Sequence, residues 1–355
     1  MSETKYFPTV EAIDKASQVL DEILEPTPFQ RNANLSDIYD AEVYLKREDL
    51  QMVRSYKIRG AYNKIRTIDP ELMKNGIVCA SAGNHAQGVA FSCSKLKIMG
   101  SIFMPVTTPR QKIEQVRMFG KEFIEIILTG DTFDAANSAA IEYAQDNNKT
   151  FIPPFDDPKV MEGQGTIGRE IFKQSKEPLD YIFVPIGGGG LASGLGAYIS
   201  RMSPSTKIIG VEPGGAPCMK AAIENGGPIK LEHIDKFVDG AAVQLAGTHT
   251  YEVCRQVLDD IVVVPEGAVC TTIIHMYNKS AIVVEPAGAL AVAALKFYKD
   301  KIKGKRVACV VSGSNNDITR MEEIREKSLL YEGLKHYFIV NFPQKSGAIL
   351  SFIRD

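Results

Sequence analysis

The sequence predicts an α/β protein with two parallel-sheet domains, the smaller inserted in the larger. Short apolar strands alternate with helical patterns from residue 76 to residue 153, and the same alternation returns from residue 163 to residue 311. Such alternation is typical of right-handed βαβ units, whose strands form a parallel sheet. The length of 355 residues allows about two domains of ~150 residues each.

The N-terminal part predicts a helix, a connector and a strand. Apolar residues recur at helical spacing over residues 7–24, and Pro26 ends that pattern. Alternation over residues 43–46 predicts a strand that should pack with the larger unit. Lys57 then lies in the first turn of a further helix, for which Ser55 is the expected N-cap.

The remaining elements follow in order. In the smaller unit, strands are expected at residues 77–80, 101–104, 123–128 and 151–152, with helices at 86–95, 109–119 and 133–145. In the larger unit, strands are expected at 181–184, 208–211, 260–264 and 306–311, with helices at 163–173, 191–200, 266–278 and 287–300. These patterns place the large domain at residues 1–52 plus 154–320, the small domain at 53–153 and a C-terminal segment at 321–355.

Composition excludes several function classes. Lys and Arg total 41 and Asp and Glu 43, so nothing in the net charge of −2 indicates a nucleic-acid or membrane partner. No apolar run approaches the ~18 residues of a membrane-spanning helix, and no secretory signal is recognisable. The six cysteines form no C-x-x-C pair, so no metal site is predicted. A cytoplasmic location is expected.

Ligands of parallel α/β sheets bind beyond the carboxyl ends of the strands. Three loops are therefore candidate ligand-binding sites: residues 81–85, 187–191 and 312–316. The second contains four consecutive glycines between a strand and a helix. Glycines let the backbone approach a ligand, and the free N–H groups of a helix start suit a phosphate. The alternative interpretation is a flexible turn. The loop matches neither the dinucleotide motif nor a Walker loop, which favours one phosphate monoester on a cofactor without a nucleotide.

The other two loops offer polar groups. Backbone N–H groups of the first can bind a substrate carboxylate, and Asn84 can hydrogen-bond a ring substituent. His85 is either catalytic or a structural residue that caps the turn. Ser312 offers a neutral hydroxyl to a ring nitrogen. Lys57 is either a surface lysine or an amine that forms a Schiff base with a carbonyl.

A phosphate cradle, a Schiff-base lysine and a neutral hydroxyl together describe pyridoxal 5'-phosphate. The chain resembles the threonine dehydratase (threonine ammonia-lyase) family of fold-type-II, tryptophan synthase β-like enzymes over about residues 5–330. The resemblance rests on six ordered motifs: SYKIRGAYN, SAGNHAQGVA, PPFDDPKVMEGQGT, VPIGGGGL, EPAGALAVAALK and VVSGSNND.

The resemblance implies a role for each residue at these motifs. Lys57 matches the lysine bound to the cofactor aldehyde, Asn84 the partner of the pyridoxal 3'-hydroxyl and Ser312 the partner of the pyridine nitrogen. The remaining matches are the phosphate loop, Gly187, Gly188, Gly189, Gly190 and Leu191, and the substrate-carboxylate loop, Ser81, Ala82, Gly83, Asn84 and His85. The implied activity is elimination of water from L-threonine, giving 2-oxobutanoate and ammonia as the first step of isoleucine biosynthesis. A homodimer or homotetramer is also implied.

Alternatives remain open at this point. A lyase acting on L-serine or another β-hydroxy amino acid differs mainly in the space beside the substrate methyl, and a regulatory protein that binds the cofactor without turnover is a further possibility. Serine racemases resemble the family but carry a serine where Ala82 stands. Cys218 stands where related proteins with a divalent metal have an acid. Glu285 either lies near the cofactor or is an acid at a helix N-terminus.

The C-terminal segment resembles the opening of an ACT-like regulatory domain. Residues 337–341 predict a strand, and residues 347–353 predict a helix start. One strand and part of a helix cannot form an independent domain. An isoleucine or valine effector is therefore expected only if that domain is intact.

Overall fold

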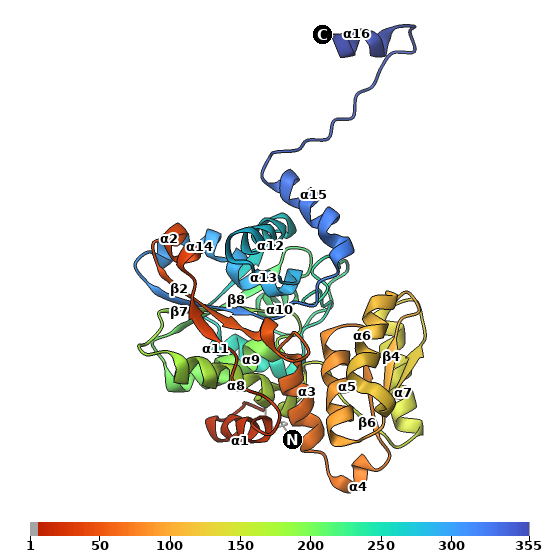
Figure 1. The fold of residues 1–355 in the computed structure, drawn as a ribbon, viewed down its shortest axis with the longest axis vertical. Helices are drawn as coiled ribbons and strands as arrows, with labels where there is room; N and C mark the ends of the chain where they lie inside the picture. The colour runs from red at the N-terminus through yellow and green to blue at the C-terminus, as the bar shows by residue number, and fades with distance from the viewer. Residues whose placement is uncertain (1–5, 355) are drawn as a thin grey trace.

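The structure, a computed structural model, describes residues 6–354 and contains two sheets that lie side by side (Figure 1). The larger sheet has six strands in the order β1 (Phe29–Arg31), β2 (Glu42–Arg47), β10 (Arg306–Val311), β7 (Tyr181–Pro185), β8 (Lys207–Pro213) and β9 (Asp260–Val264). All its neighbouring pairs are parallel except β1 and β2. The short edge strand β1 is thus an antiparallel addition that the sequence pattern did not predict.

The smaller sheet is entirely parallel. Its order is β5 (Ile124–Leu128), β4 (Gly100–Met104), β3 (Ile77–Ala80) and β6 (Thr150–Phe151). The two-sheet prediction is therefore confirmed. Each predicted strand of the two α/β units is present, with bounds that differ by at most two residues at either end.

The helices before residue 180 are α1 (Val10–Leu20), α2 (Ala33–Tyr39), α3 (Lys57–Arg66), α4 (Pro70–Met73), α5 (Asn84–Leu96), α6 (Arg110–Gly120), α7 (Phe133–Asp146) and α8 (Pro158–Gln174). The later ones are α9 (Gly190–Met202), α10 (Cys218–Asn225), α11 (Thr248–Val257), α12 (Glu266–Ser280), α13 (Pro286–Ala293), α14 (Leu295–Ile302), α15 (Met321–Tyr331) and α16 (Ala348–Arg354). Short 3-10 turns are η1 (Glu48–Leu50), η2 (Lys121–Phe123) and η3 (Ile318–Arg320). No helix within residues 6–354 has the length and apolar character that a membrane span requires.

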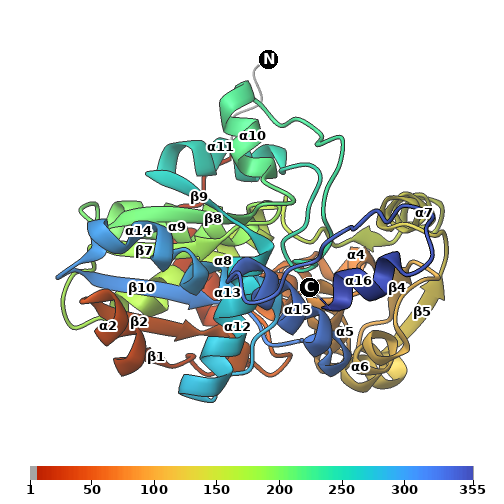
Figure 2. The same ribbon diagram turned by 90° about the horizontal axis from the view of Figure 1, so that it is seen from above.

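Both faces of the larger sheet are buried. Successive residues of β10 point to opposite faces, so Val307 and Cys309 enter one core while Ala308 and Val310 enter the other. The first core is closed by α2, α12, α13 and α14, and the second by α1, α8, α9, α10 and α11 (Figure 2). The smaller sheet is covered by α3, α5 and α6 on one face and α7 on the other. This three-layer arrangement explains why the strands read as continuous apolar runs.

Several predicted boundaries were wrong. The first helix is shorter than residues 7–24, since it begins after the N-cap Thr9. Ser55 does not cap α3, because the helix begins at Lys57; the Ser55 backbone instead forms a bridge with Gly313. Helix α8 begins five residues before the predicted position, at Pro158, because the Asp157 carboxylate accepts hydrogen bonds from the first-turn amides.

The C-terminal prediction was also partly wrong. Residues 337–341 form no strand, although α16 follows close to the predicted helix start. Figure 1 shows this segment extending away from the two sheets, beyond α15. Without a neighbouring strand to receive its backbone hydrogen bonds, a five-residue β pattern has nothing to pair with.

Helices α8 and α9 approach so closely that only glycine fits between them. A Cβ at Gly194 would lie 2.2 Å from the carbonyl oxygen of Met161, and one at Gly163 would lie 2.6 Å from that of Arg59. The second contact joins α8 to α3, the helix that Lys57 begins. Glycine at these positions therefore sets the distance between α9, α8 and α3.

Replacing Gly194 by alanine is expected to destabilise the protein by about 1–3 kcal/mol, because a rigid backbone neighbour cannot yield to the new methyl group. In an ordinary helix the same change would stabilise by up to about 1 kcal/mol. Gly227→Ala is the control, since a Cβ there meets no atom within 4 Å. Urea unfolding midpoints measure the stability of both variants. Equal midpoints for Gly194→Ala and Gly227→Ala would show that the close contact between α8 and α9 does not require glycine.

Candidate active site

One cavity gathers residues from both sheets. It is lined by Tyr56, Lys57, Asn84, Pro185, Gly187, Gly240, Ala241, Glu285, Ala287 and Ser312. Gly187 and Ser312 follow the carboxyl ends of β7 and β10, and Asn84 begins α5 after β3. Four predicted residues, Lys57, Asn84, Gly187 and Ser312, therefore meet at the position expected for a ligand of a parallel sheet.

Lys57 presents an amine whose pKa is lowered towards neutrality. Its Nζ donates a hydrogen bond to the carbonyl oxygen of Pro154 at 2.8 Å. Burial lowers the pKa of the Lys57 amine to about 8, and the negative charge of Glu285 opposes this shift. Lys57 also lines the cavity and is only partly exposed, which favours the Schiff-base interpretation over that of an ordinary surface lysine. About half of this amine is unprotonated and nucleophilic at pH 8.

The glycine loop offers backbone donors to a ligand. Helix α9 begins at Gly190, and Gly189 before it has a left-handed φ of 95°. Among residues 6–354, the amides of residues 188–191 donate to no carbonyl or side chain, although these residues are buried. A Cβ at Gly188 would lie 2.4 Å from the Phe155 ring, so the tight turn needs glycine. Buried amides without acceptors are costly, and a phosphate supplies the acceptors they lack.

Ser312 and Asn84 complete the polar lining. Ser312 is buried at the end of β10, and its hydroxyl makes no hydrogen bond with the described residues. Asn84 donates to Glu285 Oε1 at 2.7 Å and accepts from Asn315 at 2.7 Å. The Asn84 amide is thereby held at the cavity wall, with its oxygen and nitrogen orientation fixed by two partners.

Comparison with known proteins agrees with this geometry. A model of the pyridoxal-phosphate dependent enzyme family matches residues 20–313. A curated relative from Halalkalibacterium halodurans, named L-threonine dehydratase biosynthetic IlvA, is 58% identical over 346 residues, covering 98% of this chain and 83% of the relative.

The chain belongs to the threonine dehydratase family of pyridoxal-phosphate-dependent enzymes. A second relative of the same name, from Bacillus subtilis, is 56% identical and covers 98% of this chain and 82% of its own length. Among solved structures, the processed form of threonine deaminase isoform 2 from Solanum lycopersicum has a TM-score of 0.85 at 36% identity, covering 92% of this chain and 96% of that one. Maize serine racemase has a TM-score of 0.84 at 28% identity, covering 92% of this chain and 100% of that one.

The residues at the cavity fit the cofactor of this threonine dehydratase family. An amine of lowered pKa lies at one cavity, together with a run of buried amides and a hydroxyl that have no partner among residues 6–354. These are the groups that an aldehyde, a phosphate and a ring nitrogen require.

Glu285 is the carboxylate closest to this chemistry. Glu285 is an acid at a helix N-terminus, because it directly precedes α13, and it also lines the cavity. Both interpretations of this residue from the sequence therefore apply. Burial, with the like charge of Asp239, raises the pKa of the Glu285 carboxyl to about 7. Its charge therefore changes near neutral pH, within the environment of the Lys57 amine.

Replacing Glu285 by glutamine is expected to move the reactivity of Lys57 to lower pH. In the wild-type protein the amine should capture pyridoxal phosphate faster as pH rises through the Lys57 pKa of about 8. Glu285 raises that pKa, so its removal lowers it, while the glutamine carbonyl still accepts from Asn84. Stopped-flow absorbance of the cofactor-free chain, mixed with pyridoxal phosphate across neutral pH, measures the midpoint. Glu114→Gln is the control, because Glu114 is exposed on α6. The same midpoint for Glu285→Gln and the wild type would contradict the effect of Glu285 on the Lys57 pKa.

His85 has a structural environment. Its Nε2 lies 2.9 Å from the carbonyl oxygen of Ile152, and the ring is buried. Burial, with the charge of Lys57, lowers the pKa of His85 to about 3, so the ring is neutral. This contact fits the interpretation of His85 as a structural residue of the turn rather than a catalytic one. The other members of its turn, Ser81, Ala82 and Gly83, are partly exposed and do not line the cavity.

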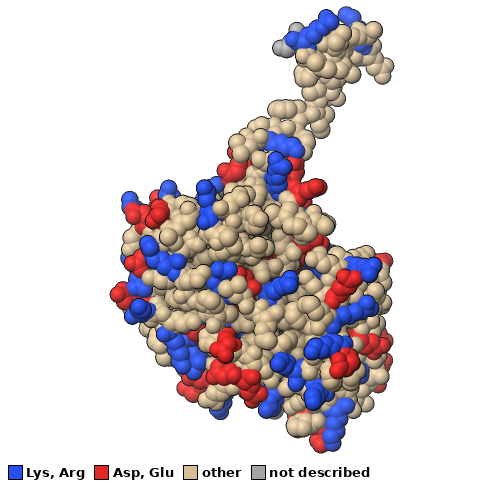
Figure 3. All heavy atoms as spheres, in the orientation of Figure 1, with Lys and Arg blue, Asp and Glu red and all other residues tan. Residues whose placement is uncertain are grey.

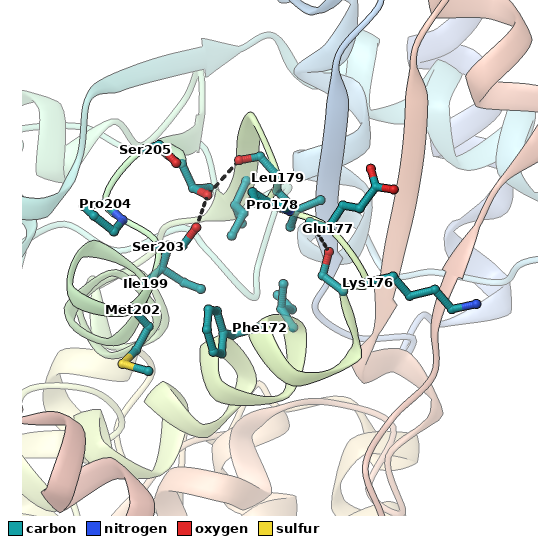
Figure 4. Close-up of a pocket in the computed structure, with 14 residues that line it drawn as sticks. Phe172, Lys176, Glu177, Pro178, Leu179, Ile199, Met202, Ser203, Pro204 and Ser205 are labelled. Atoms are coloured by element: carbon teal, nitrogen blue, oxygen red, sulfur yellow. Dashed lines mark hydrogen bonds between the residues drawn. The ribbon is translucent and has the colours of Figure 1, made fainter.

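A larger cavity lies elsewhere, at the C-terminal ends of α8 and α9 (Figure 4). Its volume is about 360 Å³, and Phe172 and Met202 project into its edge. Two hydroxyls at its wall are paired: Thr206 donates to the carbonyl of Leu179 and lies 2.8 Å from Ser203 Oγ. Its lysine, Lys176, is exposed, unlike the partly buried Lys57, so size alone does not identify the active site here.

A buried ion-pair network fixes the helix that carries Lys57. Arg59, fully buried two residues beyond Lys57, donates to both oxygens of Glu48 at 2.8 Å and to Glu170 at 2.6 Å. Glu170 also pairs with the buried Lys46. The network joins α3 to η1 and α8. The sequence analysis missed it, because an arginine within an amphipathic helix gives no signal of burial.

Proposed function

We propose that this chain eliminates water from L-threonine, giving 2-oxobutanoate and ammonia as the first step of isoleucine biosynthesis. The observation that carries the proposal is the Lys57 amine, of lowered pKa, in a cavity that Gly187 of the four-glycine loop lines. Relatives at 56–58% identity named biosynthetic L-threonine dehydratase support the choice of substrate.

The proposed roles follow from the chemistry of each group. Lys57 would hold the aldehyde carbon of the cofactor until the substrate amine displaces it. The freed Lys57 amine, with a pKa of about 8, would then take the proton from the substrate Cα. The amides of residues 188–191, with Gly187, bind the phosphate, and Ser312 and Asn84 orient the ring. When bound, pyridoxal phosphate supplies the conjugated ring that absorbs the charge left on Cα. The turn from Ser81 to His85 is assigned to the substrate carboxylate.

Ser312 suits elimination because a hydroxyl binds a ring nitrogen without carrying a charge of its own. A carboxylate in its place would favour a protonated ring nitrogen.

The remaining proposals concern domain bounds, location, assembly and regulation. We assign the large domain to residues 1–52 plus 154–320, the small domain to 53–153 and a linker with the start of a regulatory unit to 321–355; residues 1–5 and 355 lie outside the described part. Acidic and basic side chains are interspersed on the face in Figure 3, consistent with a cytoplasmic enzyme that binds a small molecule. A homodimer or homotetramer is proposed, as is an isoleucine or valine effector where the regulatory domain is intact.

Visible absorbance followed by turnover tests the proposal. The sequence has no tryptophan, and a Schiff-base band should be distinct from the protein spectrum. Adding L-threonine should release ammonia and a 2-oxoacid faster than adding L-serine, although one methyl group is worth only about 1–3 kcal/mol. Faster turnover of L-serine would make the chain a serine lyase. A band without turnover of either would leave a cofactor-binding protein.

A further inference from the structure

Three side chains contact the back of the glycine loop. Cys218 Sγ donates to the carbonyl oxygen of Gly187 at 3.4 Å, Thr250 Oγ1 donates to that of Gly188 at 2.6 Å, and Cys254 Sγ donates to that of Gly189 at 3.8 Å. These donors come from α10 and α11, which contribute no residue to the cavity lining. Three consecutive carbonyls of the loop are thus held on the side away from the cofactor cavity.

Holding these carbonyls also orients the amides that follow them. The carbonyl of one residue and the N–H of the next belong to one planar trans peptide group and point in opposite directions. A donor at the Gly188 carbonyl therefore turns the Gly189 amide to the opposite side, and the donors at Gly187 and Gly189 do the same for the amides of Gly188 and Gly190. Those are amides that lack an acceptor within residues 6–354.

We propose that Thr250 is a positioning residue for the cofactor phosphate: its hydroxyl holds the Gly188 carbonyl and thereby aims the loop amides at the phosphate. This inference rests on the proposed assignment of the glycine loop as the phosphate site. Thr250 touches neither the cavity nor Lys57. It acts through the backbone of the loop.

Thr250 is the strongest of the three donors. Its side chain is fully buried, and its hydrogen bond is the shortest. Thiols are weak donors, and burial raises the pKa of Cys218 and of Cys254, so both remain protonated. The Gly188 carbonyl has one other donor, the Gly247 amide, at 3.3 Å. Without the hydroxyl, this longer bond alone would hold the peptide group.

The position of Thr250 is itself fixed by the segment that precedes α8. The Asp156 carboxylate accepts from the backbone amides of Thr248, His249 and Thr250 at 2.9, 2.9 and 3.1 Å, which caps the first turn of α11. The preceding residue, Phe155, fills the space beside Gly188. The loop is therefore held between the Phe155 ring on one side and the Thr250 hydroxyl on another.

Two ligands that differ only in the phosphate test this inference. The full chain is freed of cofactor and titrated with pyridoxal 5'-phosphate and with pyridoxal, while the visible Schiff-base band is followed. Thr250→Val should weaken binding of pyridoxal 5'-phosphate roughly tenfold, because a buried carbonyl loses its main donor. Binding of pyridoxal, which has no phosphate, should not change. Thr250→Ser retains the hydroxyl and should bind both ligands as the wild type does.

Three results would overturn the inference. Unchanged affinity of Thr250→Val for pyridoxal 5'-phosphate would show that the hydroxyl is not needed. An equal loss for both ligands would place the effect at Lys57 or in general folding. Equal affinity of the wild-type chain for pyridoxal 5'-phosphate and for pyridoxal would instead contradict the assignment of the glycine loop as the phosphate site. If Thr250→Val does not fold, as judged by circular dichroism, Thr250→Cys replaces it; its weaker donor should give an intermediate, phosphate-dependent loss.

Discussion

Replacing Lys57 by alanine is expected to abolish both the visible Schiff-base band and the release of ammonia from L-threonine. The change removes the amine that holds the cofactor and moves the Cα proton, and a positioned base alone contributes up to roughly 10⁴-fold to rate. His85 cannot replace it, because its lowered pKa makes the ring a weak base and its Nε2 is bound to the Ile152 carbonyl. Spectra and a coupled 2-oxoacid assay measure the two losses on one sample.

The control for this variant is Lys74→Ala, since Lys74 is an exposed lysine of the same small unit and pairs only with Glu71. It should keep the band and full turnover. A Lys57→Ala protein that still showed the band would assign the Schiff base to another lysine. Retained turnover without the band would contradict the proposed role of the amine in proton transfer.

Replacing Arg59 by leucine is expected to destabilise the protein by about 3–5 kcal/mol, because Glu48 and Glu170 would keep buried charges without their main partner. The side chain of Glu48 is 0% exposed, so water cannot take the place of the guanidinium. Urea unfolding of the cofactor-free chain at fixed pH measures the change in apparent free energy.

Arg66→Leu, on the same helix, separates burial from charge. Arg66 pairs with Glu22 at 3.5 Å, but both side chains are about half exposed, at 47% and 48%. Exposed pairs of this kind contribute about 0–1 kcal/mol, so this variant should unfold close to the wild-type midpoint. Similar losses for the two arginines would mean that the charge of α3, rather than the buried network, determines its stability.

The sheets could be predicted because their strands are buried on both faces and read as uninterrupted apolar runs. Helix α11 was not predicted, since its position depends on a cap supplied by Asp156 from another part of the chain. The split between α13 and α14 at Ala294 was also missed, because the residues on both sides continue a helical pattern. Local patterns carry no information about such distant partners.

Only some residues of the candidate site could be predicted from the sequence. Lys57, Asn84, Gly187 and Ser312 could be selected because the four-glycine loop indicates a phosphate site and the six ordered motifs resemble a known family. Thr250 could not be selected, because a hydroxyl that binds a main-chain carbonyl leaves no mark on the sequence around either residue. Residues that act on the backbone of a site become visible only in three dimensions.

The hydrogen bond between Lys57 and the Pro154 carbonyl has a mechanical consequence. The chain passes from the larger sheet to the smaller between β2 and β3, and returns between β6 and β7. Lys57 lies on the first passage and Pro154 on the second, so this bond ties the two crossings together. Any swing of one sheet against the other would then turn about a hinge line close to the amine. Asn84 would travel with the smaller sheet, while Nζ would remain near the pivot.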